Sequence, residues 1–261
     1  MEYITSRQNT KLKQVVDLCA DARYRRECGL CVAHGIKLCK EAARFGLTIE
    51  SLWITDAADE KYSGQLSGIK SAARQVYGMT ESVGQKISHE RTPQGVAAVI
   101  EIPKHAEIKE LAAAGRIAVL DSVQDPGNVG AVIRIAAALG YDGVVLGGNT
   151  ADPFSPKTLR ASMGAAFVQR LAYSADLVKD LGILKENGHR LFAATLSDGA
   201  QDIADVEPSK KMTLVIGNEG SGLSPETVKA CDGAVIIPIT DRVESLNASA
   251  AAAIAMWEFR P

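Results

Sequence analysis

The stretch Ala234-Val-Ile-Ile-Pro-Ile-Thr-Asp-Arg-Val-Glu-Ser-Leu-Asn-Ala-Ser-Ala-Ala-Ala-Ala-Ile-Ala-Met-Trp257 carries the most information about the fold. Its apolar start, Ala234 to Ile237, predicts a buried strand, and Pro238 ends that strand because proline has no amide hydrogen to donate. A polar loop follows. Ser245 to Trp257 then predicts a helix rich in alanine, whose small side chains allow close approach of another backbone or a ligand. The sequence therefore places polar side chains beside a tightly packed helix.

Two upstream stretches share this organisation of apolar strand, glycine-containing turn and helix. The first is Asp125-Pro-Gly-Asn-Val-Gly-Ala-Val-Ile-Arg-Ile-Ala-Ala-Ala-Leu-Gly140, which follows the apolar run Ile117 to Leu120. The second is Val215-Ile-Gly-Asn-Glu-Gly-Ser-Gly-Leu-Ser-Pro-Glu226, which continues the apolar run Met212 to Ile216. Strands and helices alternate through this half of the chain, and such alternation predicts parallel βαβ units.

In their order and spacing, the three stretches resemble the signature motifs of the SpoU family of RNA ribose 2′-O-methyltransferases, within the SPOUT superfamily. The resemblance implies an α/β fold in which the parallel sheet of the C-terminal domain forms an α/β-knot, a trefoil knot that holds S-adenosylmethionine. The knot follows from the resemblance alone, because true knots are rare and no sequence periodicity reveals one.

The chain is expected to divide into residues 1–103, a linker at 104–115 and a methyltransferase domain at 116–261. The first region predicts a small α/β module with a long first helix reaching about Ala22. Strands are expected at 30–33, 49–55, 75–78 and 95–100, and helices at 36–45 and 82–88. A polar stretch lies between the strands at 49–55 and 75–78.

The first module resembles the substrate-binding domain that precedes the catalytic domain in ribosomal-RNA members, a ribosomal-protein-like RNA-binding domain. The resemblance rests on Ser6-Arg-Gln-Asn9, Arg25-Arg26, Gly35-Ile-Lys-Leu and the run from Thr92 to Ala97. One departure is His34, where the family usually has an acidic residue. Residues 1–45 carry nine Lys/Arg against five Asp/Glu within a chain of net charge −2. This asymmetry favours either an RNA-binding face or an ordinary solvated helix surface.

Five polar residues of the three motifs are candidates for catalysis, and the resemblance makes Arg134 the catalytic arginine. The set is Asn128, Arg134, Glu219, Ser245 and Asn247. Arginine stays charged at ordinary pH, so Arg134 either stabilises the developing alkoxide or, as proposed for the family, acts as the base. The alternative for a lone arginine on a helix is a surface ion pair.

Cofactor and RNA contacts are assigned in the same way. By resemblance, the candidates for binding S-adenosylmethionine are Gly217, Ile237 and Leu246, with Thr195 as a further lining residue. The candidates for binding RNA are Arg25, Arg26, Lys157 and Arg160. Ser155 and Pro156 predict a helix start that presents the last two of these.

A Rossmann nucleotide site is the main rival explanation for glycine-rich turns after strands. It requires Gly-x-Gly-x-x-Gly after the first strand and an acidic residue about 20 positions later. The first strand here leads to Gly127-Asn-Val-Gly130, and the denser glycine cluster lies far downstream. This pattern disfavours an NAD site and an ordinary Rossmann-type methyltransferase.

Composition indicates a soluble protein, with 46% hydrophobic and 23% charged residues and no apolar run of membrane-spanning length. A cytoplasmic location is expected because Met1-Glu-Tyr-Ile-Thr-Ser-Arg7 also lacks the apolar region of a signal peptide. The five cysteines, odd in number and scattered, are expected to be reduced thiols. Cys28, Cys31, His34 and Cys39 offer the ligand types of a zinc site, but small buried thiols are the favoured interpretation and no metal is expected.

The sequence thus predicts S-adenosylmethionine-dependent 2′-O-methylation of a ribose in RNA, with 23S ribosomal RNA as the favoured substrate. Transfer RNA and a ribosome-targeting resistance role are alternatives, as is a non-catalytic RNA-binding or ribosome-assembly factor on the same fold. A homodimer is expected because the alanine-rich last helix and the helix around Arg134 offer more apolar surface than a small domain covers.

Overall fold

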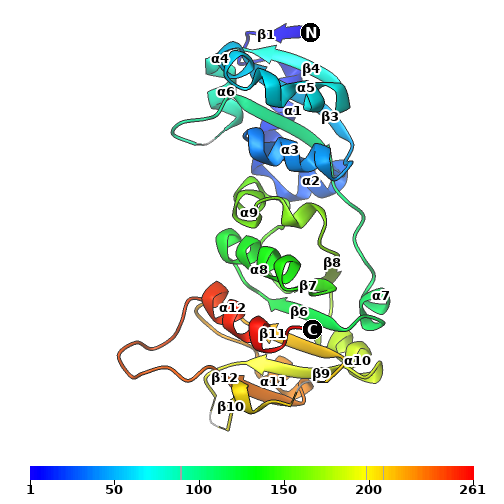
Figure 1. The fold of residues 1–261 in the computed structure, drawn as a ribbon, viewed down its shortest axis with the longest axis vertical. Helices are drawn as coiled ribbons and strands as arrows, with labels where there is room; N and C mark the ends of the chain where they lie inside the picture. The colour runs from blue at the N-terminus through cyan, green and yellow to red at the C-terminus, as the bar shows by residue number, and fades with distance from the viewer. Residues whose placement is uncertain (89, 198, 208) are drawn as a thin grey trace. The chain divides into compact units, whose positions relative to one another are not determined.

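The structure is a computed structural model that describes residues 1–88, 90–197, 199–207 and 209–261 (Figure 1). It divides into two compact units. Unit 1 comprises Met1–Pro103 together with Asp152–Phe167, and unit 2 comprises Lys104–Ala151 and Val168–Pro261. Residues 152–167 therefore pack with the N-terminal module, although the sequence assigns them to the second domain.

A five-stranded mixed sheet forms the centre of unit 1, in the order β1-β4-β3-β5-β2. Its strands are β1 (Glu2–Ile4), β2 (Leu30–His34), β3 (Ile49–Thr55), β4 (Ala73–Met79) and β5 (Val96–Glu101). β4 pairs in parallel with β1 and β3, whereas β5 runs antiparallel to β3 and β2. Apolar side chains from the strands and the first helix, among them Leu12, Trp53 and Val99, form one buried core.

The helices of unit 1 differ from expectation in two places. They are α1 (Thr10–Ala20), α2 (Ala22–Cys28), α3 (Ile36–Arg44), α4 (Asp56–Lys61), α5 (Ser63–Ala72), α6 (Glu81–Ile87) and α9 (Pro156–Ser162), with a 3-10 turn at Ala165–Phe167. The first helix ends at Ala20 because Asp21 caps a second helix, its side chain accepting from the amides of Arg23 and Tyr24. The polar stretch at 56–72 forms α4 and α5, and α5 buries Leu66 and Ile69.

Unit 2 contains a seven-stranded sheet in the order β10-β12-β9-β11-β6-β7-β8. Its strands are β6 (Arg116–Asp121), β7 (Gly143–Gly147), β8 (Leu171–Ser174), β9 (Arg190–Ala194), β10 (Gln201–Asp202), β11 (Met212–Ile216) and β12 (Gly233–Ile236). All six neighbouring pairs are parallel, which confirms the expected parallel sheet. Because β11 lies directly between β6 and β9, the turns that follow these strands share one edge of the sheet.

Helices cover both faces of this sheet (Figure 1). They are α7 (Ile108–Ala112), α8 (Pro126–Ala138), α10 (Leu177–Glu186), α11 (Pro225–Ala230) and α12 (Ala248–Glu258), with a 3-10 turn at Ile203–Asp205. α12 packs on α8, and α10 packs on α7 and α11. The last helix begins at Ala248 and not at Ser245, because the Asn247 side chain caps it by accepting from the amides of Ser249 and Ala250. None of the described helices is long and apolar enough to cross a membrane.

Candidate functional site

Three turns of unit 2 come together at the carboxyl end of its sheet. They are residues 122–125 after β6, 217–224 after β11 and 237–247 after β12. The side-chain amide of Asn218 donates to the carbonyl oxygen of Ser122 over 2.8 Å, which ties the second turn to the first. Carboxyl ends of parallel strands are where α/β sheets usually bind ligands. The geometry therefore places the candidate site at this edge.

A chain of side-chain amides and one carboxylate links all three turns. The Nδ2 of Asn128 donates to Glu219 Oε1 over 2.8 Å, and the Nδ2 of Asn247 donates to Asn128 Oδ1 over 3.2 Å. Asn128 is buried, so its amide needs both partners. Three of the five predicted catalytic residues thus form one network.

The Glu219 carboxylate is held in its charged form. Burial acts to raise its pKa, but hydrogen bonds from the Asn128 amide and from the backbone of Glu219, Gln124 and Asp125 outweigh burial and lower the pKa. The last two amides donate to Glu219 over 3.3 Å each. Glu219 therefore serves as an anionic anchor for the first turn and is not poised to accept a proton near neutral pH.

Gly217 is required by the fold of the second turn. A Cβ built on Gly217 would lie 2.6 Å from the carbonyl carbon of Gly222 and 2.7 Å from the backbone nitrogen of Leu223. Asn218 and Gly222 exchange backbone hydrogen bonds of 3.0 Å, so the turn folds back over Gly217. Any side chain at 217 would meet this backbone before it reached a ligand.

The segments that follow β9, β11 and β12 line a cavity of about 610 Å³, together with the start of α12. A smaller cavity of about 120 Å³ adjoins it on the β12 side, and the two share Thr195, Ser245 and Leu246 in their walls. Gly217 lines the larger cavity and Ile237 the smaller. The structure thus brings all four candidate cofactor residues, Thr195, Gly217, Ile237 and Leu246, to one connected site with an apolar part and a part lined by main chain.

The other two catalytic candidates lie differently. Ser245 is exposed and lines both cavities. Arg134 lies on the exposed face of α8, while Asn128, Val132 and Ala136 lie on its buried face. Among the described residues, no hydrogen bond or ion pair of the Arg134 side chain is found. A single chain therefore does not bring Arg134 into the Asn128–Glu219–Asn247 network, and the geometry gives no support to the surface ion pair.

The four RNA candidates all belong to unit 1, and Arg25 departs from the expected role. Arg25 is 3% exposed, and its guanidinium contacts the Asp152 carboxylate and two backbone carbonyls. It is therefore not available to a phosphate. Arg26 and Lys157 are exposed, and Arg160 is half-buried with a 3.2 Å contact to Glu90.

Among the described residues, Cys28, Cys31, His34 and Cys39 do not form a zinc site. Cys31 and Cys39 are fully buried, whereas Cys28 is exposed. His34 Nε2 lies 3.4 Å from the thiol of Cys19, which the sequence did not single out. Burial raises the pKa of Cys19 to about 12, which keeps it a thiol. Within the described part of the chain, no group of three or more His, Cys, Asp or Glu side chains forms a metal-binding cluster.

Two residues that organise the site were missed from the sequence. Asn218 accepts from the amides of Gly220 and Ser221 through Oδ1, in addition to its contact with Ser122. Asp125 caps α8 by accepting from the amide of Asn128. An Asn inside a glycine-rich turn and an Asp directly before Pro are recognisable turn and cap signals, so both could have been found.

Comparison with known proteins gives this site a family. Residues 115–257 match the model of the SpoU rRNA Methylase family, and residues 9–98 match the MRM3-like substrate binding domain. The chain is 31% identical over 264 residues to 23S rRNA (guanosine(2553)-2'-O)-methyltransferase RlmP of Bacillus subtilis (strain 168), with 100% of each chain covered.

Solved structures agree over nearly the whole chain. The AdoMet-bound rRNA methyltransferase from Sinorhizobium meliloti has a TM-score of 0.84 and 29% identity, covering 98% of this chain and 96% of that one. The SpoU methyltransferase AviRb from Streptomyces viridochromogenes, in complex with AdoMet, has a TM-score of 0.85 and 25% identity, covering 96% and 97%. Fold and site thus define an RNA methyltransferase with a separate substrate-binding domain. The chain belongs to the SpoU rRNA methylase family.

Proposed function

We propose that this protein transfers the methyl group of S-adenosylmethionine to a ribose 2′-hydroxyl in RNA, with large-subunit ribosomal RNA as the substrate. The observation that carries the proposal is the connected cavity of unit 2, which is lined by Thr195, Gly217, Ile237 and Leu246 and adjoins the Asn128–Glu219–Asn247 network. Membership of the SpoU family and full-length similarity to a 23S rRNA methyltransferase support the choice of substrate.

The cavity fits the proposed cofactor in its chemistry. Apolar side chains such as Ile237 and Leu246 suit an adenine ring, and the main chain of residues 217–222 offers polar groups to the rest of the molecule. Acidic side chains, Glu219 and Glu244, line the larger cavity and favour a cationic ligand. When bound, the cofactor supplies an electrophilic methyl group.

The protein's own part in the reaction is to position a ribose oxygen and to stabilise its negative charge. A ribose hydroxyl is a poor nucleophile until it loses its proton, so alignment and charge stabilisation both lower the barrier. We assign charge stabilisation to Arg134, whose planar guanidinium can contact an alkoxide and a phosphate together. Asn128, Glu219 and Asn247 hold the three turns in register, and Ser245 lies at the cavity where it can contact the hydroxyl.

The exposed Arg134 side chain makes no hydrogen bond or ion pair with the described residues of its own chain. We therefore propose a homodimer in which Arg134 reaches the cavity of the partner subunit. The exposed face of α8 carries Ala137 and Ala138 beside Arg134. α12 packs on α8 and exposes two large apolar side chains, Ile254 and Trp257. Exposed apolar side chains on packed helices are typical of an interface.

The proposal also includes the trefoil knot and separate roles for the two units, with unit 1 binding RNA and unit 2 transferring the methyl group. The turn at 237–247 supplies Leu246 and Asn247 to the cavity, and α12 supplies Ala251 and Ala252. By resemblance, this last third of the domain forms the trefoil knot, and we propose the same here. Unit 1 supplies RNA affinity through Arg26, Lys157 and Arg160. A protein that acts on ribosomal RNA belongs in the cytoplasm, and we propose that location.

The test is a methyl-transfer assay with tritiated S-adenosylmethionine on purified 23S ribosomal RNA, with transfer RNA as a parallel substrate. Incorporation into 23S RNA, mapped by resistance of the 2′-O-methylated position to alkaline cleavage, is the expected result. Cofactor binding without transfer to either RNA would favour the non-catalytic assembly factor. Methylation of transfer RNA alone would identify transfer RNA as the substrate and would leave the proposed reaction unchanged.

A further inference from the structure

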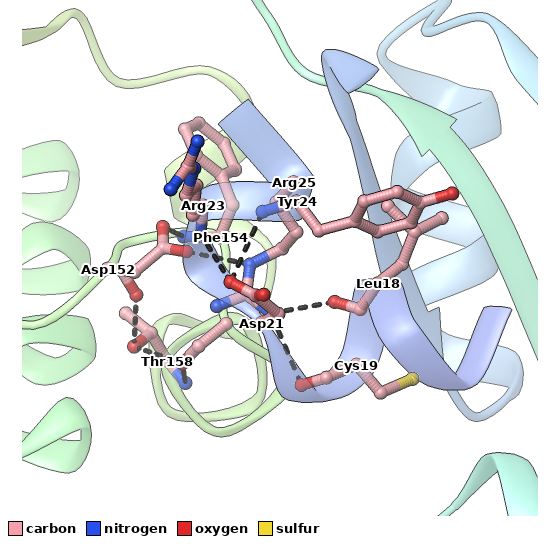
Figure 2. Close-up of polar contacts among 10 residues, drawn as sticks. Leu18, Cys19, Asp21, Arg23, Tyr24, Arg25, Asp152, Phe154 and Thr158 are labelled. Carbon is pink, nitrogen blue, oxygen red and sulfur yellow. Dashed lines mark hydrogen bonds and ion pairs between the residues drawn. The ribbon is translucent and has the colours of Figure 1, made fainter. Parts of the chain in front are cut away.

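Arg25 lies inside unit 1 as part of a buried ion pair (Figure 2). Its Nε donates to Asp152 Oδ2 over 2.7 Å, and the two side chains are 4% and 10% exposed. Its Nη1 donates to the carbonyl oxygens of Leu18, over 2.6 Å, and of Cys19, over 3.2 Å. One guanidinium therefore joins the end of α1 to a residue 127 positions further along the chain.

Asp152 is held from its own side of the contact as well. Its Oδ1 accepts from the amide of Phe154 over 2.9 Å, and its carbonyl oxygen accepts from Thr158 Oγ1 over 2.8 Å. Thr158 lies in α9, which Ser155 caps by accepting from the Thr158 amide. The direction in which α9 leaves the turn is thus set by the residue that pairs with Arg25.

Two further contacts attach the segment 152–167 to unit 1. Gly164 has a φ of 85°, and a Cβ on it would lie 3.3 Å from the Cβ of Glu41 in α3, so its backbone packs closely on that helix. Arg160 contacts Glu90 over 3.2 Å, in the loop after α6. The segment is therefore anchored on α2, on α3 and on the loop after α6.

A guanidinium buried this deeply is costly unless its hydration is replaced. Asp152 and the two carbonyls replace it, and the planar fork of arginine serves acceptors in several fixed directions at once. A buried ion pair adds little stability compared with apolar residues of similar size, so its main effect is to fix one geometry. The geometry that this pair fixes is the placement of α9 on the N-terminal module.

We propose that Arg25 and Asp152 are positioning residues for RNA binding. Their ion pair holds α9 on the N-terminal module, so that Lys157 and Arg160 join Arg26 in one phosphate-binding surface of unit 1. Residues 152–167 lie within the segment that matches the SpoU methylase model, yet in this role they serve substrate binding. The inference rests on the proposed function, because it assigns part of the surface that the RNA substrate would contact.

The test compares Asp152→Asn with the surface double variant Lys157→Gln/Arg160→Gln and with their combination. Asp152→Asn keeps the size of the side chain but removes the charge that Arg25 contacts. The probe is in vitro-transcribed 23S ribosomal RNA, and the readouts are its Kd between low and moderate salt, methyl transfer and S-adenosylmethionine affinity. Arg23→Gln is the matched control, because Arg23 is an exposed arginine of the same helix, paired with Glu27.

The expected result is that Asp152→Asn weakens RNA binding on the order of tenfold at low salt and flattens its salt dependence, because displaced Lys157 and Arg160 no longer release counterions. Adding Lys157→Gln/Arg160→Gln to Asp152→Asn should reduce RNA affinity little further, since the phosphate contacts of Lys157 and Arg160 are already lost. Cofactor affinity should be unchanged, and hydrogen exchange should rise within residues 152–167. Arg23→Gln should leave the exchange of that segment unaltered.

A purely structural ion pair would lower thermal stability without changing the salt dependence, and that outcome in folded Asp152→Asn would overturn the proposal. If Asp152→Asn does not fold, the surface double variant decides, since unchanged RNA affinity and salt dependence there would also overturn it. Wild-type protein that fails to methylate any RNA would instead refute the proposed function. The two failures are therefore distinguishable.

Discussion

Asn128 and Glu219 lie 91 positions apart in the chain, and the Nδ2 of Asn128 donates to Glu219 Oε1 over 2.8 Å. The contact joins the start of α8 to the turn after β11. Asn247 extends it to the turn before α12 by donating to Asn128 Oδ1 over 3.2 Å. Because the three side chains come from α8 and from the turns after β11 and β12, removing one should loosen the contacts between these segments.

Glu219→Gln should make stability less dependent on pH. The folded protein lowers the pKa of Glu219, so its ionised form contributes stability above the unfolded pKa of about 4.3, and this contribution is lost as pH falls through the folded pKa. Wild type should therefore unfold at a higher temperature than Glu219→Gln at neutral pH. The gap should begin to narrow as pH falls below about 4.3 and should vanish only below the folded pKa.

The measurement is thermal unfolding of wild type and Glu219→Gln at two pH values, one neutral and one below the folded pKa of Glu219. Glu226→Gln, at an exposed glutamate of α11, is the control and should show a much smaller change between them. A stability gap of equal size at both pH values would mean that the charge of Glu219 does not anchor the first turn.

Gly217→Ala should distort the turn that follows β11. The added Cβ would lie 2.6 Å from the carbonyl carbon of Gly222, so the backbone of that turn must shift. Overpacking of this kind costs about 1–3 kcal/mol. Binding of S-adenosylmethionine should weaken together with stability, as measured by calorimetry and thermal unfolding.

Gly220→Ala is the matched control, because a Cβ there meets only the Asn218 side chain at an ordinary 3.6 Å. It should leave stability nearly unchanged. Equal losses of stability in the two variants would contradict the assigned role of Gly217.

The parallel sheet of unit 2 could be predicted because its strands are short apolar runs that alternate with helices. A strand was expected at Ile117 to Leu120, and β6 lies at Arg116–Asp121; β11 was expected from Met212 to Ile216 and lies there. Local signals of this kind need no distant partner. The meeting of Asn128, Glu219 and Asn247 followed only from the family motifs, since no local rule pairs residues so far apart.

Arg25 shows where such local interpretation ends. Two adjacent arginines in a basic helix favour an RNA surface on charge alone. The partner that buries Arg25, Asp152, lies 127 positions away, and periodicity carries no information about it. Gly217 was assigned to the cofactor by resemblance and lines the larger cavity, but the close packing of its backbone on Gly222 was not foreseen.

Ala251→Trp should fill the cofactor cavity. Ala251 lines both parts of the cavity, so a large ring there would occupy the space proposed for the cofactor. Ala250→Trp is the matched control, since Ala250 is the exposed neighbour on the same helix and lines neither part. Calorimetry should show at least about a tenfold loss of S-adenosylmethionine affinity for Ala251→Trp alone. Equal affinities would place the cofactor elsewhere.

Removal of residues 1–103 should leave a protein that binds cofactor, because every residue that lines the cavity belongs to unit 2. The segment 152–167 should lose its order, since its anchors Arg25, Glu41 and Glu90 are absent. Its amide hydrogens should exchange fast while those of β6 and β11 remain protected. RNA methylation should fall strongly. Full protection of 152–167 in the truncated protein would contradict its assignment to unit 1.

Arg134→Ala should preserve the fold and cofactor binding, because the side chain is exposed and no contact within the described residues depends on it. Methyl transfer should fall on the order of a hundredfold or more, the scale expected when a preorganised charge is removed from a transition state. Arg134→Lys should not restore it, because an ammonium cannot contact hydroxyl and phosphate in one plane. Single-turnover transfer from tritiated S-adenosylmethionine measures both variants.

Mixing two inactive variants tests whether Arg134 acts in the cavity of the partner subunit or in the cavity of its own chain. Heterodimers of Arg134→Ala with Ala251→Trp contain one cavity that binds cofactor, in the Arg134→Ala chain, and one intact arginine, in the other chain. If Arg134 acts across the dimer, that arginine serves the working cavity and about half of the wild-type activity should return. If Arg134 acts within its own chain, the mixed dimer should stay inactive. A Lys variant within a few-fold of wild type would remove Arg134 from the chemistry altogether.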